Sequence, residues 1–271
     1  MKSRKEQSIN SKIISLLNSL QLSESLITGT KLLLEDEEIQ AVQEYANTVS
    51  IVRLGFNDHG PVHMRIVALN TILMADLLRK AGIKMSLENE ECGNFEDSLL
   101  AIIISSMLHD IGMGIGRQDH EIHSGYLSYP LINRILNEIY PGDIHRQVVI
   151  RSLALEGIKG HMGSRIIHSL EAGIVQVADG CDMTKGRARI SIAISHTPRV
   201  GSIHQFSANS IEEVQIHAGQ EKPIRLDVHM SSEIGLFQVE EVLLGKISTS
   251  TAKPFIELYA QVKDKELRRY L

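Results

Sequence analysis

Histidine is the residue type in this chain that most clearly invites a chemical interpretation. The sequence has 271 residues and 12 histidines, and eight of the 12 lie between His59 and His168. Neutral imidazole is the commonest side-chain ligand for metal ions in proteins. The histidines therefore indicate metal chemistry, and their spacing decides which of them are candidates.

The most informative pair is His109-Asp110. It directly follows the apolar run 99–108, so both side chains are expected at the end of a buried helix. Burying an imidazole and a carboxylate costs free energy unless both are compensated, and a divalent ion such as Mn, Fe, Zn or Mg compensates both. The alternative is a helix terminator in which His109 bonds to its neighbour's carboxylate, and for an isolated dipeptide this alternative is sufficient.

A second candidate pair is His59 and His63. These histidines are four residues apart, which would place both imidazoles on one face of a helix. Pro61 lies between them and fits the first turn of that helix, with His59 at the cap. The alternative is a solvated helix start without a metal.

Asp179 is the third candidate, because it lies in the apolar stretch 172–179 and needs a partner there. The alternatives to a metal ion are a helix cap or an ion pair with Arg187 or Arg189. Metal ligation becomes the better interpretation once the other ligands are present.

The order His63, His109-Asp110, Asp179 resembles the H…HD…D signature of the HD-domain superfamily of metal-dependent phosphohydrolases. The segments that carry the resemblance are Val62-His63-Met-Arg-Ile-Val-Ala68, Met107-Leu-His109-Asp110-Ile-Gly112 and Leu170-Glu-Ala-Gly-Ile-Val-Gln-Val-Ala-Asp179. The resemblance covers roughly residues 50 to 190. It implies a helical metal-binding domain with His109 and Asp110 at its catalytic centre.

The same resemblance implies a larger ligand set. Dinuclear branches of the superfamily place extra histidines between the HD pair and the last aspartate, the interval that holds His120 and His161. The implied ligands are His63, His109, Asp110, His120, His161 and Asp179, with Asp110 bridging two ions. One or two divalent ions per chain are expected, from among Mn, Fe, Zn, Mg, Ni and Co. His123 and His145 remain alternatives to His120 and His161, because the sequence has no adjacent His-His pair.

The implied activity is hydrolysis of a small-molecule phosphomonoester or phosphodiester, with nucleotides among the candidates. Metal ions activate water and polarise the phosphoryl group, and cationic side chains hold the phosphate. Lys185, Arg187 and Arg189 follow the Asp179 segment and are the predicted substrate-binding residues. The alternative for this basic run is a solvated hinge between domains. The glycine-rich segment 112–116 is a further candidate for a phosphate-binding loop.

Two other functions remain open at this point. Some HD-domain proteins use a similar ligand set for two irons and are oxygenases. A non-catalytic, metal-stabilised protein that senses a ligand or binds a partner is the third class. The sequence does not separate these functions, because one fold hosts many activities.

The elements that must position these residues are mainly helical. Apolar residues recur at helical spacing in 62–78, are nearly continuous in 95–108, and mark further helices at 122–140, 144–158 and 170–181. Pro141-Gly142 separates two of these helices, and Asp143 is a predicted N-cap. After about residue 190 the pattern alternates, which predicts strands at 211–217, 223–230 and 255–262 and a helix at 236–247.

The predicted fold is therefore mainly α: a helical HD-type body followed by a small α+β domain. The predicted divisions are a helical N-terminal segment 1–50, the metal-binding domain 51–190 and the α+β domain 191–271. That last domain could bind an anion at a helix N-terminus, or serve as a lid or an oligomerisation domain. A homodimer is expected from the prevalence of symmetric oligomers.

Composition excludes several classes of protein. The net charge is −5, which argues against general nucleic-acid binding. The sequence has no run of 18 apolar residues, so no membrane span is expected. The charged N-terminus does not resemble a secretory signal. Two cysteines are too few for a disulfide framework, so a cytoplasmic protein is expected.

Overall fold

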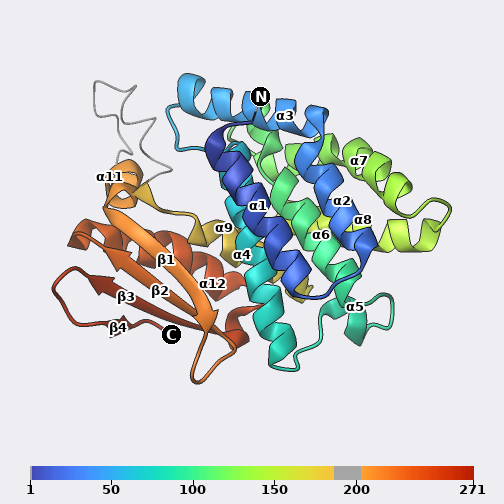
Figure 1. Ribbon diagram of the computed structural model, residues 1–271. Coiled ribbons are helices and arrows are strands. Elements are labelled where there is room, and N and C mark those ends of the chain that lie inside the picture. The colour runs from blue at the N-terminus through green and yellow to red at the C-terminus, as the bar shows by residue number, and fades with distance from the viewer. Residues whose placement is uncertain (1, 186–202) are drawn as a thin grey trace.

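A computed structural model describes residues 2–185 and 203–271. It shows a body of packed helices with a small sheet near the C-terminus, as Figure 1 shows. The prediction of a mainly helical fold with a small α+β region at its end is confirmed.

The helices of the body follow one another with short connections. Their bounds are α1 (Arg4–Ser19), α2 (Glu24–Glu35), α3 (Glu37–Thr48), the π-helix η1 (Val49–Arg53), α4 (Pro61–Lys80), α5 (Ser86–Asn89), α6 (Phe95–Leu108), the 3-10 helix η2 (Ile111–Gly114), α7 (His120–Ile139), α8 (Ile144–Gly160) and α9 (Leu170–Cys181). Asp143 caps α8 as predicted, since its carboxylate accepts from the amide of Arg146. At α4, Pro61 occupies the first turn but Gly60 is the N-cap, so the prediction of His59 at the cap is wrong by one residue.

Helix α6 lies at the centre of this body and explains why its sequence is apolar on every side. Its residues from Ser98 to Leu108 are all buried, and it packs against α4, α8 and α9. Helices α4 and α9 also pack against each other. Four helices that carry or end at candidate ligands are therefore fixed to one another by a continuous apolar core.

Two segments of the described chain are long and apolar enough to cross a membrane. They are Pro61–Lys80 and Phe95–Gly114, whose most apolar windows are 67% and 94% buried inside the fold. Core helices of soluble proteins pass the same test of length and composition. Their burial is what a helix at the centre of a packed body requires.

Arg65 joins the first three helices to α4. Its side chain is 1% exposed, and its guanidinium donates five hydrogen bonds, to side-chain oxygens of Asn10, Gln40 and Gln43 and to the carbonyl oxygens of Leu34 and Pro61. A guanidinium has five N–H groups, so this buried cation is fully hydrogen-bonded. Burial lowers its pKa from the ordinary value for arginine.

The C-terminal region builds a four-stranded sheet in the order β1-β2-β3-β4. Its elements are α11 (Ile203–Ser210), β1 (Ile211–Ala218), β2 (Ile224–Met230), the 3-10 helix η3 (Glu233–Gly235), the π-helix η4 (Gln238–Leu243), α12 (Leu244–Thr249), the 3-10 helix η5 (Lys253–Phe255), β3 (Ile256–Val262) and β4 (Arg268–Arg269). Strands β1 and β2 form an antiparallel hairpin, whereas β2 and β3 are parallel. Because parallel neighbours need a crossover, η4 and α12 connect them. The sequence predicted three of these strands but not β4.

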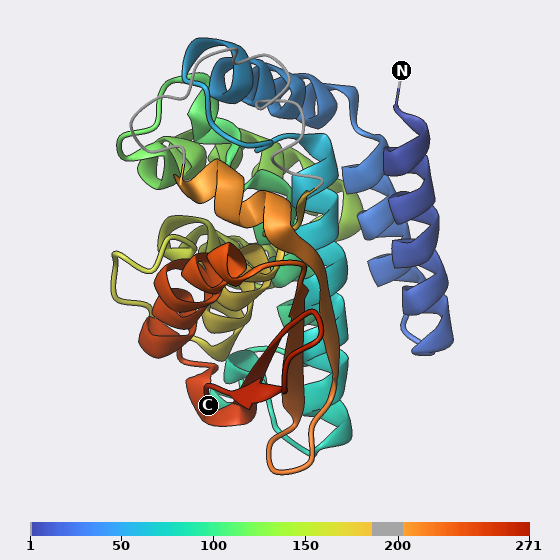
Figure 2. The same ribbon diagram turned by 90° about the vertical axis from the view of Figure 1, so that its left-hand side faces the viewer.

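The sheet region packs directly on the helical body. Strands β1 and β2 contact α4, and α12 contacts α9. In Figure 2, the red-orange crossover that includes α12 lies beside the sheet and in front of the yellow helices of the body. The crossover of the small sheet is thus the part of the C-terminal region that reaches the helix carrying Asp179.

The glycine-rich segment after Asp110 differs from the predicted flexible loop. Residues 111–114 form a 3-10 helix against the start of α7. A Cβ atom on Gly112 would lie 2.1 Å from the carbonyl oxygen of His120 and 2.6 Å from the amide nitrogen of Ser124. Glycine is therefore required here for close packing on α7, and the amide of Gly112 donates to the hydroxyl of Ser124.

Candidate metal centre

The six residues predicted as metal ligands come together in one buried cluster. Each lies at or near the end of a helix. His109 is the C-cap of α6, His120 is the first residue of α7, and His161 is the C-cap of α8. None of the six is more than 6% exposed. We call this group the metal cluster: His63, His109, Asp110, His120, His161 and Asp179.

One side of the cluster, which we call the first half-site, combines two imidazoles and two carboxylates. The Nε2 atoms of His63 and His109 are 3.1 Å apart, and each lies 3.3 Å from Oδ2 of Asp110. Oδ1 of Asp179 lies 3.2 Å from His63 Nε2 and 3.8 Å from His109 Nε2. The first half-site therefore offers two nitrogen and two oxygen atoms around one point.

The second half-site uses the other oxygen of the same carboxylate. Oδ1 of Asp110 lies 3.2 Å from His120 Nε2 and 3.4 Å from His161 Nε2. These two nitrogens are 3.2 Å apart. Asp110 thus presents one oxygen to each half-site, which is the arrangement of a bridging ligand.

The spacing of these atoms fits a metal ion. Ligands that bind a metal at about 2.1 Å are separated from one another by roughly 3.0 to 3.4 Å in octahedral or tetrahedral geometry. Most of the nitrogen and oxygen contacts in both half-sites fall at or close to these values. The buried His and Asp side chains could therefore hold a metal ion.

Hydrogen bonds behind the histidines point their lone pairs into the cluster. The Nδ1 atoms of His109, His120 and His161 lie 2.9, 3.0 and 2.7 Å from carbonyl oxygens of Ser106, Arg117 and Ile158 respectively. A carbonyl oxygen only accepts, so each Nδ1 carries the proton and each neutral imidazole directs the lone pair of Nε2 inward. Histidines that bind metals in proteins almost always donate their other N–H in this way.

His63 is oriented by a carboxylate instead. Its Nδ1 lies 2.7 Å from Oδ2 of Asp182, which is also buried. The sequence interpretation assigned no role to Asp182. Its position, three residues after Asp179 and just past the last turn of α9, was the available signal.

The charges of the cluster favour ionised carboxylates. Burial opposes ionisation of Asp110, but His109 and the other nearby imidazoles hold its pKa well below the usual range. The pKa of Asp179 is likewise held low against burial, chiefly by Lys246 and then by His109 and His63.

The pKa values of His161 and His109 are shifted in opposite directions. Burial lowers the pKa of His161 to about 4, so its ring is neutral at pH 7. Burial would also lower the pKa of His109, but Asp110 and Asp179 outweigh it and raise that pKa. The carboxylates are thus concentrated at the first half-site, where they attract cations most strongly.

Lys246 is the second residue that the sequence interpretation missed. Its ammonium, on α12, forms an ion pair with Oδ2 of Asp179 and donates to the carbonyl oxygen of His161 at 2.9 Å. The signal for it lies on α9, where Gly173 and Gly180 leave one face of the helix open to close approach.

The remaining predicted residues lie elsewhere. Lys185 is exposed, and Arg187 and Arg189 lie outside the described residues, so the predicted phosphate-binding role of this run stays a prediction. Among the described residues, His123 and His145 are not in the metal cluster, and His145 is exposed. The ring of His59 lies 6.0 Å from that of His63.

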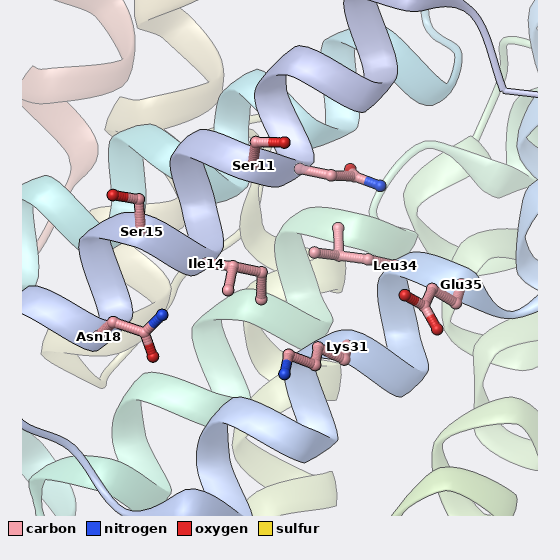
Figure 3. A pocket seen from close by; sticks show the side chains of 8 residues that line it. Ser11, Ile14, Ser15, Asn18, Lys31, Leu34 and Glu35 are labelled. Atoms are coloured by element: carbon pink, nitrogen blue, oxygen red, sulfur yellow. The ribbon is translucent and has the colours of Figure 1, made fainter.

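A separate groove lies between α1 and α2. Its volume is about 500 Å³, and polar residues of α1 face Lys31, Leu34 and Glu35 of α2 across it, as Figure 3 shows. No member of the metal cluster lines it. The groove and the metal cluster are therefore distinct features.

The uncharacterized protein MJ1020 of Methanocaldococcus jannaschii is 39% identical over 247 residues, which cover 91% of this chain and 92% of that protein. No protein-family model matches the sequence, and no solved structure matches the fold. The similarity to MJ1020 extends over nearly the whole of both chains, so this chain belongs to the same protein family as MJ1020.

Proposed function

We propose that this protein is a metal-dependent phosphohydrolase of the HD superfamily, acting on a small-molecule phosphomonoester or phosphodiester. Nucleotides are the first substrates to examine. The observation that carries the proposal is the carboxylate of Asp110, which presents one oxygen to each of two groups of imidazoles. Two divalent ions held in this way would lie close enough to act on one phosphoryl group.

The donor set narrows the ions to be tested. Four imidazole nitrogens and two carboxylates suit Mn, Fe, Zn, Ni and Co, and Mg remains a candidate through the carboxylates. Bound divalent ions supply an activated water and neutralise charge on the phosphoryl oxygens.

The protein's own residues supply the rest of the arrangement. Asp182 and three backbone carbonyls fix the imidazole rings, so little reorganisation is needed when ions bind. The apolar core around α6 lowers the local dielectric and strengthens the field of the cluster.

The test is an activity panel on protein that has been stripped with a chelator and reloaded with one ion at a time. Substrates are nucleoside mono-, di- and triphosphates, a cyclic nucleotide and a generic aryl phosphate. We expect phosphate release with at least one ion, and none from the Asp110→Asn variant. Asp264→Asn is the matched control, because Asp264 is an exposed carboxylate in a left-handed turn that asparagine also tolerates.

Two results would replace this proposal with one of the alternatives. Substrate oxidation that needs iron and oxygen, together with a mixed-valent iron signal, would indicate a diiron oxygenase. Metal binding without turnover of any phosphate ester would indicate a metal-stabilised sensor or interaction protein.

A cytoplasmic location and a homodimer belong to the same proposal, and both rest on sequence composition and general prevalence. Light scattering of the purified protein tests the dimer. A mass of one chain, close to 30.2 kDa, would contradict it.

A further inference from the structure

We propose that Lys246, from the C-terminal α+β region, is the residue that binds the substrate's phosphoryl group in the metal centre. The inference rests on the proposed phosphohydrolase function and adds to it a specific residue outside the helical body. It also gives the small sheet a role, since its crossover would supply part of the active site.

Lys246 contacts one residue from each half-site. Its ammonium contacts Asp179, which belongs to the first, and the backbone carbonyl of His161, which belongs to the second. Among the described residues it is the only lysine or arginine that forms an ion pair with a member of the metal cluster. A phosphoryl group that contacted both ions would therefore lie close to this cation.

Metal binding and the Lys246 contact use different atoms of Asp179. Oδ1 faces the imidazoles of His63 and His109, whereas Oδ2 accepts from Lys246. An ion in the first half-site would therefore leave the ammonium in place. A cation so close to bound divalent ions is repelled by them, and an anionic ligand between them would remove that repulsion.

The ammonium also has a hydrogen-bond donor to spare. It has three N–H groups, and within the described residues it donates to two acceptors. The third N–H is the group that a phosphoryl oxygen would take.

Solvent reaches the cluster at this same corner. The side chains of Lys246 and Asp179 are 10% and 8% exposed. The other five members of the cluster have side chains that are 0 to 3% exposed. A substrate that arrives from solvent would meet the ammonium and Asp179 first.

Helix α9 holds both the backbone and the side chain of Lys246 in this position. The side-chain amide of Gln176 on α9 donates to the carbonyl oxygen of Lys246 and to the hydroxyl of Thr249. Gly180 allows the aliphatic part of the lysine to lie on α9, because a Cβ there would be only 3.1 Å from Cδ of Lys246. A π-helix, η4, directly precedes α12, and such irregular turns are frequent at functional sites.

The test compares phosphate binding and metal content in four proteins: wild type, Lys246→Met, Lys246→Arg and Lys253→Met. Lys253 is an exposed lysine of the same region and serves as the matched control for loss of charge. Inorganic phosphate is titrated calorimetrically into the Mn-loaded protein, and bound Mn is counted by elemental analysis.

We expect Lys246→Met to keep its Mn and to bind phosphate about 10- to 100-fold more weakly, as for loss of a charge-assisted hydrogen bond. Lys246→Arg should recover part of the affinity, and Lys253→Met should match wild type. With a phosphate ester that the wild type hydrolyses, KM of Lys246→Met should rise by a larger factor than kcat falls.

The inference is overturned if Lys246→Met binds phosphate as wild type does. It is also overturned if that variant loses Mn in proportion to its loss of phosphate, since Lys246 would then be a purely structural partner of Asp179. Either result with normal ester hydrolysis in wild type would leave the proposed phosphohydrolase function intact. Absence of hydrolysis in wild type would count against the proposed function separately.

Discussion

The two half-sites of the metal cluster share one carboxylate but are built differently around it. The first has two imidazoles and Asp179 beside Asp110, and a further carboxylate, Asp182, stands behind His63. The second has only the imidazoles of His120 and His161, and each of them is oriented by a backbone carbonyl. The first half-site is therefore richer in both ligand atoms and negative charge.

This difference indicates an order of occupancy. A site with four protein ligands and two carboxylates should hold a divalent ion more tightly than one with three ligands and one carboxylate. The second ion would have more positions left for water or substrate oxygens, as open catalytic sites do. We expect the first half-site to retain its ion through purification and the second to exchange it.

The largest expected effect comes from removing the carboxylate of Asp110, which both half-sites share. Asp110→Ala should lose both ions, because each half-site loses an oxygen ligand and the cluster loses a negative charge. Activity should fall more than about 100-fold. Elemental analysis gives the metal content, and retention of two ions would show that Asp110 does not bridge them.

The next effect separates the half-sites. His120→Ala should leave one ion per chain, since the four ligand atoms of the first half-site are untouched. His63→Ala should lose the tighter ion and leave weak binding at most. Calorimetric titration of the metal-free variants with Mn measures how many ions each binds and how tightly. Equal losses of Mn binding in the two variants would contradict the proposed asymmetry.

A smaller effect is expected from the carboxylate behind His63. Asp182→Asn keeps a hydrogen-bond acceptor but removes the charge, and it should weaken the first ion by about 10- to 100-fold. Binding at the second half-site should stay the same. A change confined to the second ion would mean that Asp182 acts on the cluster in another way than through His63.

The smallest effect is expected at His123 and His145, the two histidines that the sequence left as alternatives to His120 and His161. His123→Ala and His145→Ala should each retain two ions and full activity, because neither residue belongs to the cluster. Metal loss in either variant would show that the described geometry omits a ligand.

Much of the fold could be predicted from periodicity because its core helices have simple patterns. Helix α6 is apolar on all sides and buried on all sides, and α9 was predicted with the bounds it has in the structure. The order of His63, His109-Asp110 and Asp179 then selected side chains that the structure brings together. These predictions depended on local sequence and on residue order.

Lys246 and Asp182 could not be found in the same way. Lys246 reaches Asp179 across 67 positions of sequence, and Asp182 reaches His63 across 119. Such contacts depend on how α12 and the end of α9 pack, which a single sequence does not specify. The basic run at 185–189 stays a prediction for binding phosphate, and the structure adds a lysine from the C-terminal crossover that lies beside the cluster.

The buried guanidinium of Arg65 has a consequence for how the molecule unfolds. Its hydrogen bonds join α1, α2 and α3 to a residue two positions after His63 on α4. Peeling any one of these helices away would leave a buried cation with an unsatisfied donor, which costs more than an ordinary lost contact. The first helices and the helix that carries His63 should therefore melt together in a single cooperative transition, and hydrogen exchange should protect their amides to a similar degree.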